Sequence, residues 1–370
     1  MKRRNFIAAV TTTAALGGLS ACSKATEQCS DTSGTTKQKV IKWKMVTTWP
    51  KNFQGLGEGA EFLARIINKM SGGRLQVKVY GSGELVPALQ TFDAVSQGTA
   101  QMGHGASYYW KGKMPAAPFF TTVPFGLTVS EIQGWLLKGG GYELWRELYK
   151  PFGVRPFVAG NTGVQMAGWF NKEIHSLDDI KGLKMRIPGL GGEVLRRAGG
   201  TPVLIPGSEV FTALETGAVD AAEWVGPYND LAMGLYKAAK YYYYPGWHEP
   251  GTSAEALVNQ QAFDALPEDL QLIVEQACHA ASLDMQADFT AKNNASLQVL
   301  VEQHQVQLRK LPDDVLIKLR EISEQVVTES AQKNELGKRI LKSFNSYKKQ
   351  VRAWNEISEG AYLDSLRLSK

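Results

Sequence analysis

One arginine stands where the chain could hold an anion. The segment Lys184–Ile187 has the character of a strand, and Pro188-Gly189 directly after it cannot continue a ladder and turns the chain away. Arg186 is therefore expected at a strand end. Its guanidinium stays charged at any accessible pH, and its parallel N–H donors match the two oxygens of a carboxylate. This position suits the capture of an organic acid, whereas an arbitrary arginine more often pairs with an acidic side chain at the surface.

The residues around Arg186 belong to a longer pattern. It begins at Leu177–Gly189 and continues at Leu214–Trp224, and the same pattern includes Thr47–Pro50, Gly105–Trp110, Gly160–Gln165, Glu223-Trp224 and Trp247–Gly251. Together these segments resemble the solute-binding proteins of TRAP transporters, the DctP family, from about Val40 to the C-terminus. The similarity is greatest to the branch that binds 2-oxo acids such as pyruvate. It implies an α/β fold of the two-lobed, periplasmic binding protein type II-like kind, with long C-terminal helices.

The resemblance also implies roles for particular residues. Arg186 would bind the substrate carboxylate, and Gln165 would touch both the substrate and a metal ion. The metal shell would consist of the Glu223 and Glu249 carboxylates, the Trp224 main-chain oxygen and the Gln165 side-chain oxygen. The other expected substrate-binding residues are Tyr108, Tyr109, Asn161 and Trp49. Trp49 and the two tyrosines could equally be core residues, but their loop positions favour the wall of a pocket.

The implied metal shell is chemically consistent. Oxygen donors without cysteine or paired histidine suit a hard cation such as Na⁺ or Ca²⁺ rather than zinc. In a buried site, Glu223, Glu249 and a carboxylate ligand would set three negative charges against the one positive charge of Arg186. A cation would offset that repulsion, and Na⁺ and Ca²⁺ both remain open. Each glutamate could otherwise be an ordinary solvated surface carboxylate.

The N-terminus has the pattern of an export signal. Met1–Arg4 is basic and the run from Phe6 to Ala21 is apolar, uncharged and too short to span a membrane. Arg3-Arg4 resembles a twin-arginine signal, and Leu19–Cys22 resembles a lipoprotein processing site in which Cys22 is lipidated, although an ordinary secretory signal could also contain this cysteine. Acyl chains on Cys22 would anchor the protein to a membrane, because each buried CH₂ contributes about 0.8 kcal/mol.

Composition limits the function. The formal charge of +5 includes three basic residues of the signal, so the remaining chain carries only +2, and we expect no nucleic-acid partner. Beyond Cys22 the cysteines are Cys29 and Cys278, without neighbours at metal spacing. No segment after Ala21 is long and apolar enough to span a bilayer, so a soluble mature chain is expected.

The order of patterns predicts the organisation of the chain. We expect a signal peptide over 1–21, a lipidated N-terminus and flexible tether over 22–39, a first lobe over 40–160 with part of 250–290, a second lobe over 161–249, and a long helix with a C-terminal helical region over 267–370. Strands are predicted at Val40–Val46 and Leu75–Tyr80, with helices from Leu56 to Gly72 and near Val86–Ser96. Tyr241–Glu249 is predicted as a buried crossing strand.

The helix after Pro267 meets no Gly or Pro before Pro312, so it could run about 50 Å, longer than one lobe. It could therefore pair with a second copy and form a homodimer through the C-terminal helical region, or lie across both lobes of a monomer.

The function expected from all of this is the extracytoplasmic binding component of a TRAP transporter. The ligand would be a small monocarboxylate, a 2-oxo or 2-hydroxy acid such as pyruvate or lactate, bound between the lobes and passed to the membrane subunits. The protein would be a periplasmic or cell-surface lipoprotein and not an enzyme. Two alternatives remain open at this point: a binding lipoprotein that feeds a sensor, and a lyase or hydrolase on the same fold. The histidines show no metal spacing, and Gly189–Gly192 does not complete a dinucleotide motif.

Overall fold

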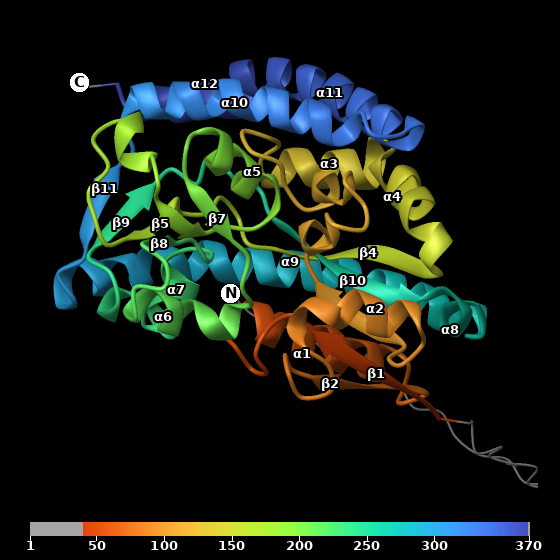
Figure 1. Ribbon diagram of the computed structural model, residues 1–370. Coiled ribbons are helices and arrows are strands. Elements are labelled where there is room, and N and C mark those ends of the chain that lie inside the picture. The colour runs from red at the N-terminus through yellow and green to blue at the C-terminus, as the bar shows by residue number, and fades with distance from the viewer. Residues whose placement is uncertain (1–39, 369–370) are drawn as a thin grey trace, which may run out of the picture. The chain divides into compact units, whose positions relative to one another are not determined.

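The structure is a computed structural model that describes residues 40–368 (Figure 1). The expected signal peptide, the Cys22 lipidation site and the tether lie outside this range. Within it, no helix combines the length and the apolar character needed to cross a membrane. The described residues form two mixed sheets with helices around them, as the resemblance implied.

The helices and strands follow one another along the chain as β1 (Ile41–Thr47), α1 (Leu56–Met70), β2 (Leu75–Tyr80), α2 (Thr91–Ser96), β3 (Met102–Gly105), α3 (Val129–Lys138), α4 (Gly141–Tyr149), β4 (Val154–Asn161), β5 (Gly168–Phe170), β6 (Lys184–Arg186), α5 (Gly189–Arg197), β7 (Thr201–Val203), α6 (Gly207–Glu215), β8 (Ala221–Ala222), α7 (Pro227–Met233), β9 (Tyr241–Tyr244), β10 (Ser253–Asn259), α8 (Gln260–Asp264), α9 (Glu268–Gln298), β11 (Gln307–Lys310), α10 (Asp313–Ala331), α11 (Glu335–Asn355) and α12 (Ala361–Ser365).

The first sheet has the strand order β2-β1-β3-β10-β4. β1 pairs in parallel with β2 and β3, whereas β10 is antiparallel to both of its neighbours. β1 and α1 form as their patterns predicted, because Trp43 and Met45 alternate into the core and α1 buries residues on one face, among them Leu63 and Ile67. This sheet carries β10 from late in the chain, so the chain must leave it after β4 and return.

The second sheet has the order β11-β9-β5-β8-β6-β7. β6 pairs in parallel with β8, and the register sets Arg186 beside Ala222. The chain passes from the first sheet to the second through residues 162–167 and returns through residues 245–252, and we call these two stretches the crossing segments. The lobe boundaries that the sequence predicted at these stretches stay a prediction.

Helix α9 has contacts with both halves. It packs on β4 and α1, which belong with the first sheet, and on α7, which follows β8 of the second sheet. Its buried face runs from Leu270 through Val274 and Ala281 to Phe289. Of the two arrangements expected for this helix, the one that lies across both halves of its own chain is present in the structure.

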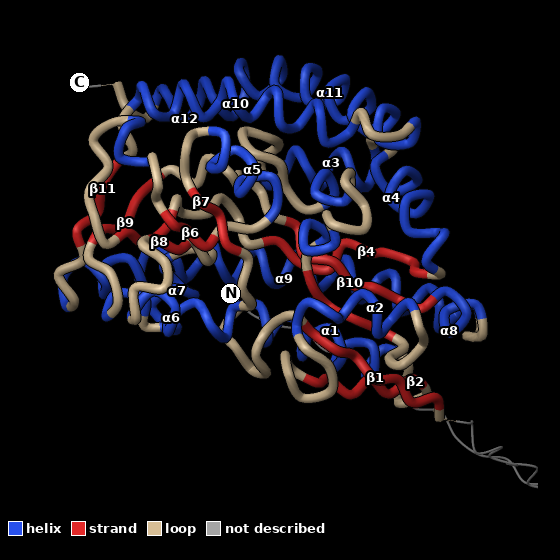
Figure 2. Tube along the Cα trace, viewed as in Figure 1, coloured by secondary structure: helices blue, strands red, loops and turns tan. Residues whose placement is uncertain are grey.

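The two long helices α10 and α11 run side by side as an antiparallel hairpin and form one outer layer (Figure 1). Figure 2 shows α3, α4 and α5 between this hairpin and the strands. α10 packs on α5, and α11 packs on α3 and α4. The hairpin therefore touches elements that belong with both sheets.

Three expectations about local structure were wrong in their limits. The helix after Pro267 does not continue to Pro312, because a π-helical turn at Val299–Gln303 ends it and β11 follows. Tyr241–Glu249 is a strand only as far as Tyr244, since Pro245 has no N–H to donate to a ladder. In Val86–Ser96, the segment begins as a short 3-10 turn after Pro87 and becomes α-helical only at Thr91.

Candidate functional site

Arg186 and Glu223 lie at the carboxyl ends of adjacent parallel strands. Arg186 is the last residue of β6, as the sequence predicted, and Glu223 follows β8 directly. Both side chains are buried, and Arg186 Nη1 donates to the Glu223 carbonyl oxygen at 2.7 Å and to Glu223 Oε1. The Arg186 guanidinium also lies 5.2 Å from the centre of the Trp224 ring. In α/β proteins this edge of a parallel sheet is where ligands bind.

The two crossing segments carry two more candidate oxygen ligands, Gln165 and Glu249. The Gln165 N–H donates to the Glu249 carbonyl oxygen at 3.1 Å, so the two segments are paired at this point. The Met166 N–H donates to the Val225 carbonyl oxygen at 3.0 Å, which ties the first crossing segment to the loop after Glu223. Gln165 and Glu249 are thus attached to the half of the protein that carries Arg186.

The carboxylates converge around a histidine. Glu223, His248 and Glu249 each offer one ligand atom, and these atoms lie within 4.8 Å of one another. His248 Nε2 lies 3.2 Å from Glu223 Oε2, and Thr252 Oγ1 donates to Glu249 Oε2 at 2.6 Å. All of these side chains are buried. The two glutamates that the resemblance assigned to a metal shell therefore do lie together, and the solvated-surface alternative for them is excluded.

Four buried polar atoms at this cluster have no hydrogen-bond partner among the described residues. They are Gln165 Oε1, Arg186 Nη2, Trp224 Nε1 and His248 Nδ1. A buried polar group left without a partner costs about 1–3 kcal/mol, so these atoms indicate where another molecule binds. The orphaned Gln165 oxygen lies on a segment whose backbone is paired with Glu249, and it fits a hard cation. The orphaned guanidinium N–H group of Arg186 fits an anion.

The electrostatics of the cluster agree with this assignment. Burial raises the pKa of Glu249 to about 8, and the charge of Glu223 adds to the increase. Burial raises the pKa of Glu223 to about 7 against the opposing effect of Arg186. Burial lowers the pKa of His248 to about 4, so its imidazole is neutral and supplies no positive charge. Two ionised carboxylates are therefore unfavourable here beside the single charge of Arg186, and a bound cation would favour their ionised forms.

An aromatic wall from the first sheet's side faces these charges. The Tyr108 and Tyr109 rings are 4.7 Å apart, and Trp49 lies 6.3 Å from Tyr109 and 6.4 Å from Trp224. Burial raises the pKa of Tyr108 well above its usual value, and the charge of Glu249 adds to that effect. Trp49 Nε1 already donates to His104 Nδ1 at 2.8 Å, and the role of these three residues as a pocket wall stays a prediction.

Asn161 has protein partners at both ends of its amide. Its Oδ1 accepts from the Gly163 N–H at 2.9 Å, and its Nδ2 donates to Ser253 Oγ at 3.4 Å. It therefore fixes the start of the first crossing segment. A direct contact between Asn161 and the substrate stays a prediction.

Two further buried carboxylates, one in each half, hold the turn and the loop that carry residues of the site. Glu255 on β10 accepts from Ser107 Oγ at 3.0 Å, Trp110 Nε1 at 2.6 Å and Tyr149 Oη at 3.0 Å, and so holds the turn that carries Tyr108. Burial raises its pKa to about 7.

Asp230 on α7 has the equivalent position in the other half. It accepts from Trp169 Nε1 at 2.9 Å, from Tyr242 Oη at 2.7 Å and from the Val225 and Gly226 N–H groups at 3.2 Å. It therefore holds the loop that carries Glu223 and the Trp224 carbonyl group.

Sequence reasoning did not single out His248, Glu255 or Asp230. A single histidine without a second one at ligand spacing carries no metal signal, and lone acids resemble surface residues in a sequence. His248 could have been found, because it lies within the segment Trp247–Gly251 that carried the resemblance. The roles of Glu255 and Asp230 depend on tryptophans and tyrosines far away in the sequence.

Comparison with known proteins decides the family. Residues 45–334 match the bacterial extracellular solute-binding protein family 7, DctP. A monocarboxylate 2-oxoacid-binding periplasmic protein of Nostoc sp. is 42% identical over 362 residues, which are 98% of each chain. The chain belongs to this family.

Two solved structures of TRAP periplasmic solute-binding proteins are also similar to this one. The protein from Colwellia psychrerythraea, with bound calcium and pyruvate, is 46% identical and has a TM-score of 0.86 over 88% of this chain and 100% of that chain. The protein from Pseudoalteromonas atlantica, with bound sodium and pyruvate, is 45% identical and has a TM-score of 0.86 over 88% of this chain and 99% of that chain. The fold class predicted from the sequence is confirmed: this DctP solute-binding protein has the two-sheet fold of its relatives.

Proposed function

We propose that this solute-binding protein takes up a small 2-oxo or 2-hydroxy monocarboxylate, such as pyruvate or lactate, together with Na⁺ or Ca²⁺, and presents it to the membrane subunits of a TRAP transporter. The ligand is enclosed between the Arg186 cluster and the aromatic wall. Family membership favours transport over a catalytic role. The relatives with bound pyruvate contain calcium in one case and sodium in the other, which supports either cation here.

The proposed roles follow the chemistry of the groups. Arg186 binds the ligand carboxylate through the N–H group that has no protein partner among residues 40–368. Glu223, Glu249, the Trp224 carbonyl oxygen and Gln165 Oε1 hold the cation, which supplies positive charge for the carboxylate and the adjacent oxygen of the ligand. Tyr108, Tyr109 and Trp49 close the apolar side of the ligand, and Asn161 stays a proposed contact.

The main support for this ligand pair is one feature of the cluster. An unsatisfied guanidinium N–H group and an unsatisfied amide oxygen are buried in one cluster with two carboxylates. An anionic ligand together with a cation satisfies both orphans, and the cation favours the ionised forms of the two carboxylates. A 2-oxo or 2-hydroxy acid offers two neighbouring oxygens to the cation, whereas propionate offers only its carboxylate.

Calorimetry with pyruvate, lactate and propionate tests the proposal. The protein is first stripped with a chelator in Na⁺-free buffer and then supplied with CaCl₂ or NaCl. We expect pyruvate or lactate to bind several-fold more tightly than propionate, and only when a cation is present. Ligand and cation should each increase the other's affinity by the same factor. Equal binding of pyruvate in stripped and supplied protein would overturn the cation requirement.

We also propose that Cys22 is lipidated and anchors the protein at the periplasmic or cell-surface side of a membrane, through the tether of residues 22–39. The support is the Leu19–Cys22 pattern and the polar composition that follows it. Cys22→Ala should move the protein from the detergent-extracted fraction to the soluble fraction without changing pyruvate affinity. If the Cys22→Ala variant still remains in the membrane fraction, Cys22 is not the anchor.

A homodimer through the C-terminal helical region is a further proposal. Its support is the set of exposed apolar side chains near the end of the last helices: Trp354, Ile357, Tyr362, Leu363, Leu366 and Leu368. Light scattering at micromolar concentration should give about twice the chain mass. A single species near the 40.6 kDa of one chain would exclude the dimer.

A further inference from the structure

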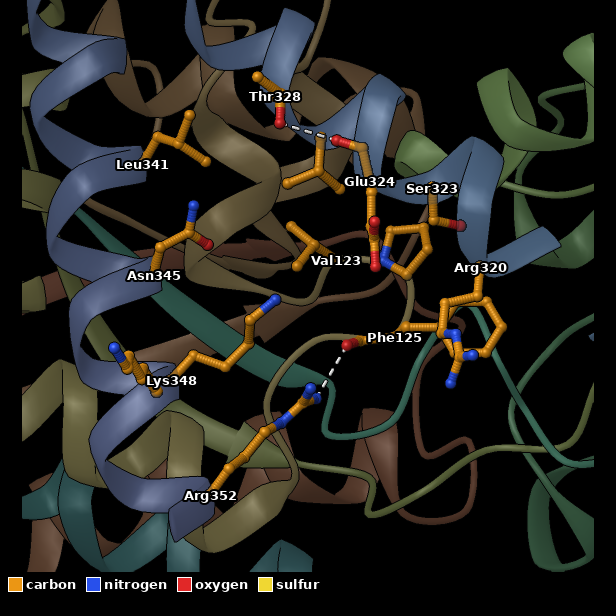
Figure 3. A pocket seen from close by; sticks show the side chains of 13 residues that line it. Val123, Phe125, Arg320, Ser323, Glu324, Thr328, Leu341, Asn345, Lys348 and Arg352 are labelled. Carbon is orange, nitrogen blue, oxygen red and sulfur yellow. Dashed lines mark hydrogen bonds between the residues drawn. The ribbon is translucent and has the colours of Figure 1, made fainter. Parts of the chain in front are cut away.

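A cavity of about 410 Å³ lies between α10, α11 and the loop that contains Val123 and Phe125 (Figure 3). Val327 of α10 and Leu341 of α11 also line it, so much of its surface is apolar. None of the residues of the Arg186 cluster lines this cavity. It is a separate space, and the proposed function makes no use of it.

Most of the charged groups around the cavity are positive. Its lining includes Arg320, Lys348, Lys349 and Arg352, and Glu324 is the acidic side chain among them. Arg352 is engaged, because its Nη2 donates to the Phe125 and Gly126 carbonyl oxygens at 2.9 and 2.7 Å.

The other three cations form no ion pair and no hydrogen bond with any residue in the range 40–368. Lys348 is half-buried and extends from α11 into the space between the helices (Figure 3). Burial lowers the pKa of Lys348, and the charge of Arg352 adds to that effect. The charges of Glu324 and Glu131 offset part of this effect, but four cations against Glu324 leave the lining with an excess of positive charge.

We propose that this cavity is a second binding site, for a small organic anion with an apolar body. An inorganic anion would compensate the charges but leave the apolar floor formed by Val123, Phe125 and Val327 uncovered. A neutral apolar molecule would cover the floor and leave Lys348 and Arg320 without a counter-charge. A carboxylate on an aromatic or branched aliphatic body satisfies both parts of the lining.

The position of the cavity links it to the first site. α10 is fixed to α5 by the ion pair between Glu329 and Arg197, on the side of the second sheet. α11 is fixed to the side of the first sheet by the Arg339–Glu147 ion pair, 2.6 Å long. A molecule held between α10 and α11 therefore bridges elements from both halves, so its affinity depends on how the halves are arranged.

Phe125, which lines the cavity, contacts Trp247, and Trp247 lies close in sequence to Glu249 of the proposed metal shell. The Phe125 N–H donates to the Trp247 carbonyl oxygen at 2.8 Å, and the two rings lie 6.0 Å apart. Trp247 is two residues from Glu249. Phe125 has a φ of 51°, a strained conformation for a residue other than glycine, and the Arg352 bond to its carbonyl group holds it there. Anion binding in the cavity is therefore coupled to ligand binding at Arg186, and this coupling, unlike the second site, rests on the proposed function.

The second site is tested with benzoate as the probe. Saturation-transfer NMR and calorimetry of the whole protein, loaded with calcium, should give saturable benzoate binding. Replacing both cations, Arg320→Met with Lys348→Met, should weaken this binding about tenfold or more, because two charge-assisted contacts are lost. Lys342→Met, which removes a charge from α11 outside the cavity, is the matched control and should leave it unchanged. Inorganic phosphate should bind more weakly than benzoate.

Arg186→Met separates the two sites. This variant lacks the proposed carboxylate contact of the first site, so benzoate binding that survives in it occurs elsewhere. Loss of benzoate binding in Arg186→Met alone would overturn the proposal, and so would the absence of saturable binding to the wild type. If Lys342→Met weakens benzoate binding as much as the double variant does, the loss follows from overall charge, and the second site is overturned as well.

The coupling is measured by titrating pyruvate with and without saturating benzoate. We expect the pyruvate dissociation constant to change at least about threefold, and the benzoate constant to change by the same factor with saturating pyruvate. Constants that do not change would refute the coupling. If pyruvate does not bind at all, the proposed function fails, while the benzoate result stands on its own.

Discussion

Two groups of buried carboxylates can be compared in this protein, and burial does not distinguish them. Glu223 and Glu249 at the candidate site and Glu255 and Asp230 beneath it are all shielded from solvent, and burial raises the pKa of each to about 7 or 8. The partners differ. Glu255 accepts from three side chains and Asp230 from two side chains and two backbone N–H groups.

Around Glu223 and Glu249, by contrast, Gln165 Oε1 and Arg186 Nη2 have no partner among the described residues. A closed hydrogen-bond network needs nothing more, whereas an open one requires a further molecule. The lesson is that unsatisfied neighbours, and not burial or a raised pKa, separate a binding carboxylate from a supporting one.

Arg186→Met should have the largest effect. It leaves the ligand carboxylate buried without its counter-charge at a cost of roughly 3–5 kcal/mol, which lowers pyruvate affinity by about two to three and a half decades. Calorimetry measures the loss, and Arg196→Met, an exposed arginine of α5, is the matched control. Affinity within threefold of the wild type would remove Arg186 from the site.

Glu249→Gln should reduce pyruvate affinity by about 10–100-fold, because an isosteric amide removes one negative charge from the cation shell. The dependence of affinity on calcium or sodium should shrink with it. Thermal shift measurements with and without CaCl₂ check this, and Glu143→Gln on the exposed face of α4 serves as control. An undiminished calcium-induced stabilisation in Glu249→Gln would mean that Glu249 is a supporting residue like Glu255.

Gln165→Met should weaken pyruvate binding about tenfold, since one neutral oxygen ligand contributes less than a carboxylate. The loss should come with a weaker affinity for calcium, because the missing oxygen faces the cation. A calcium titration at fixed pyruvate concentration measures this. A calcium affinity equal to that of the wild type would assign Gln165 to the ligand alone.

Glu255→Gln should change pyruvate affinity by less than about threefold, because Glu255 belongs to the closed network. Its effect is on stability. The folded-state pKa of about 7 lies above the unfolded value of 4.5, so the folded protein binds more protons between these limits and loses stability as the pH rises through them. This pH-dependent loss in the free energy of unfolding amounts to about 3 kcal/mol, and it should be absent in Glu255→Gln.

Urea unfolding of wild type and Glu255→Gln across this pH interval gives the difference directly. The gap between the two proteins should grow in favour of the variant as the pH rises, and a parallel pair of curves would show that Glu255 has an ordinary pKa. The control is again Glu143→Gln, because Glu143 is exposed on α4.

The sequence predicts those parts of the fold that depend on local pattern. β1, β2 and α1 agree closely with their expected bounds, because alternation and helical spacing are properties of neighbouring residues. The end of α9 could not be predicted. β11 forms because Gln307–Lys310 pairs with β9, more than sixty residues earlier in the chain, and no residue between Pro267 and Pro312 marks the change.

The site shows the same division. Arg186 is placed correctly at its strand end by Pro188-Gly189, a local signal. Gln165, Glu223 and Glu249 were identified only through family resemblance, since each is an ordinary polar residue in its own segment. Their convergence requires both crossing segments and the β8 loop, and tertiary structure alone brings these together.

The attachment of the crossing segments to the second sheet has a kinetic consequence. Gln165 and Glu249 are bonded to each other, and the neighbouring Met166 is bonded to Val225, so Arg186 and the groups proposed to hold the cation are joined in one half of the protein. The other half contributes Trp49, Tyr108 and Tyr109, which are aromatic. An acid can therefore dock on the ionic half before the aromatic half covers it. We expect the ionic groups to govern the association rate and its dependence on salt, and the aromatic residues to govern the time the acid remains bound.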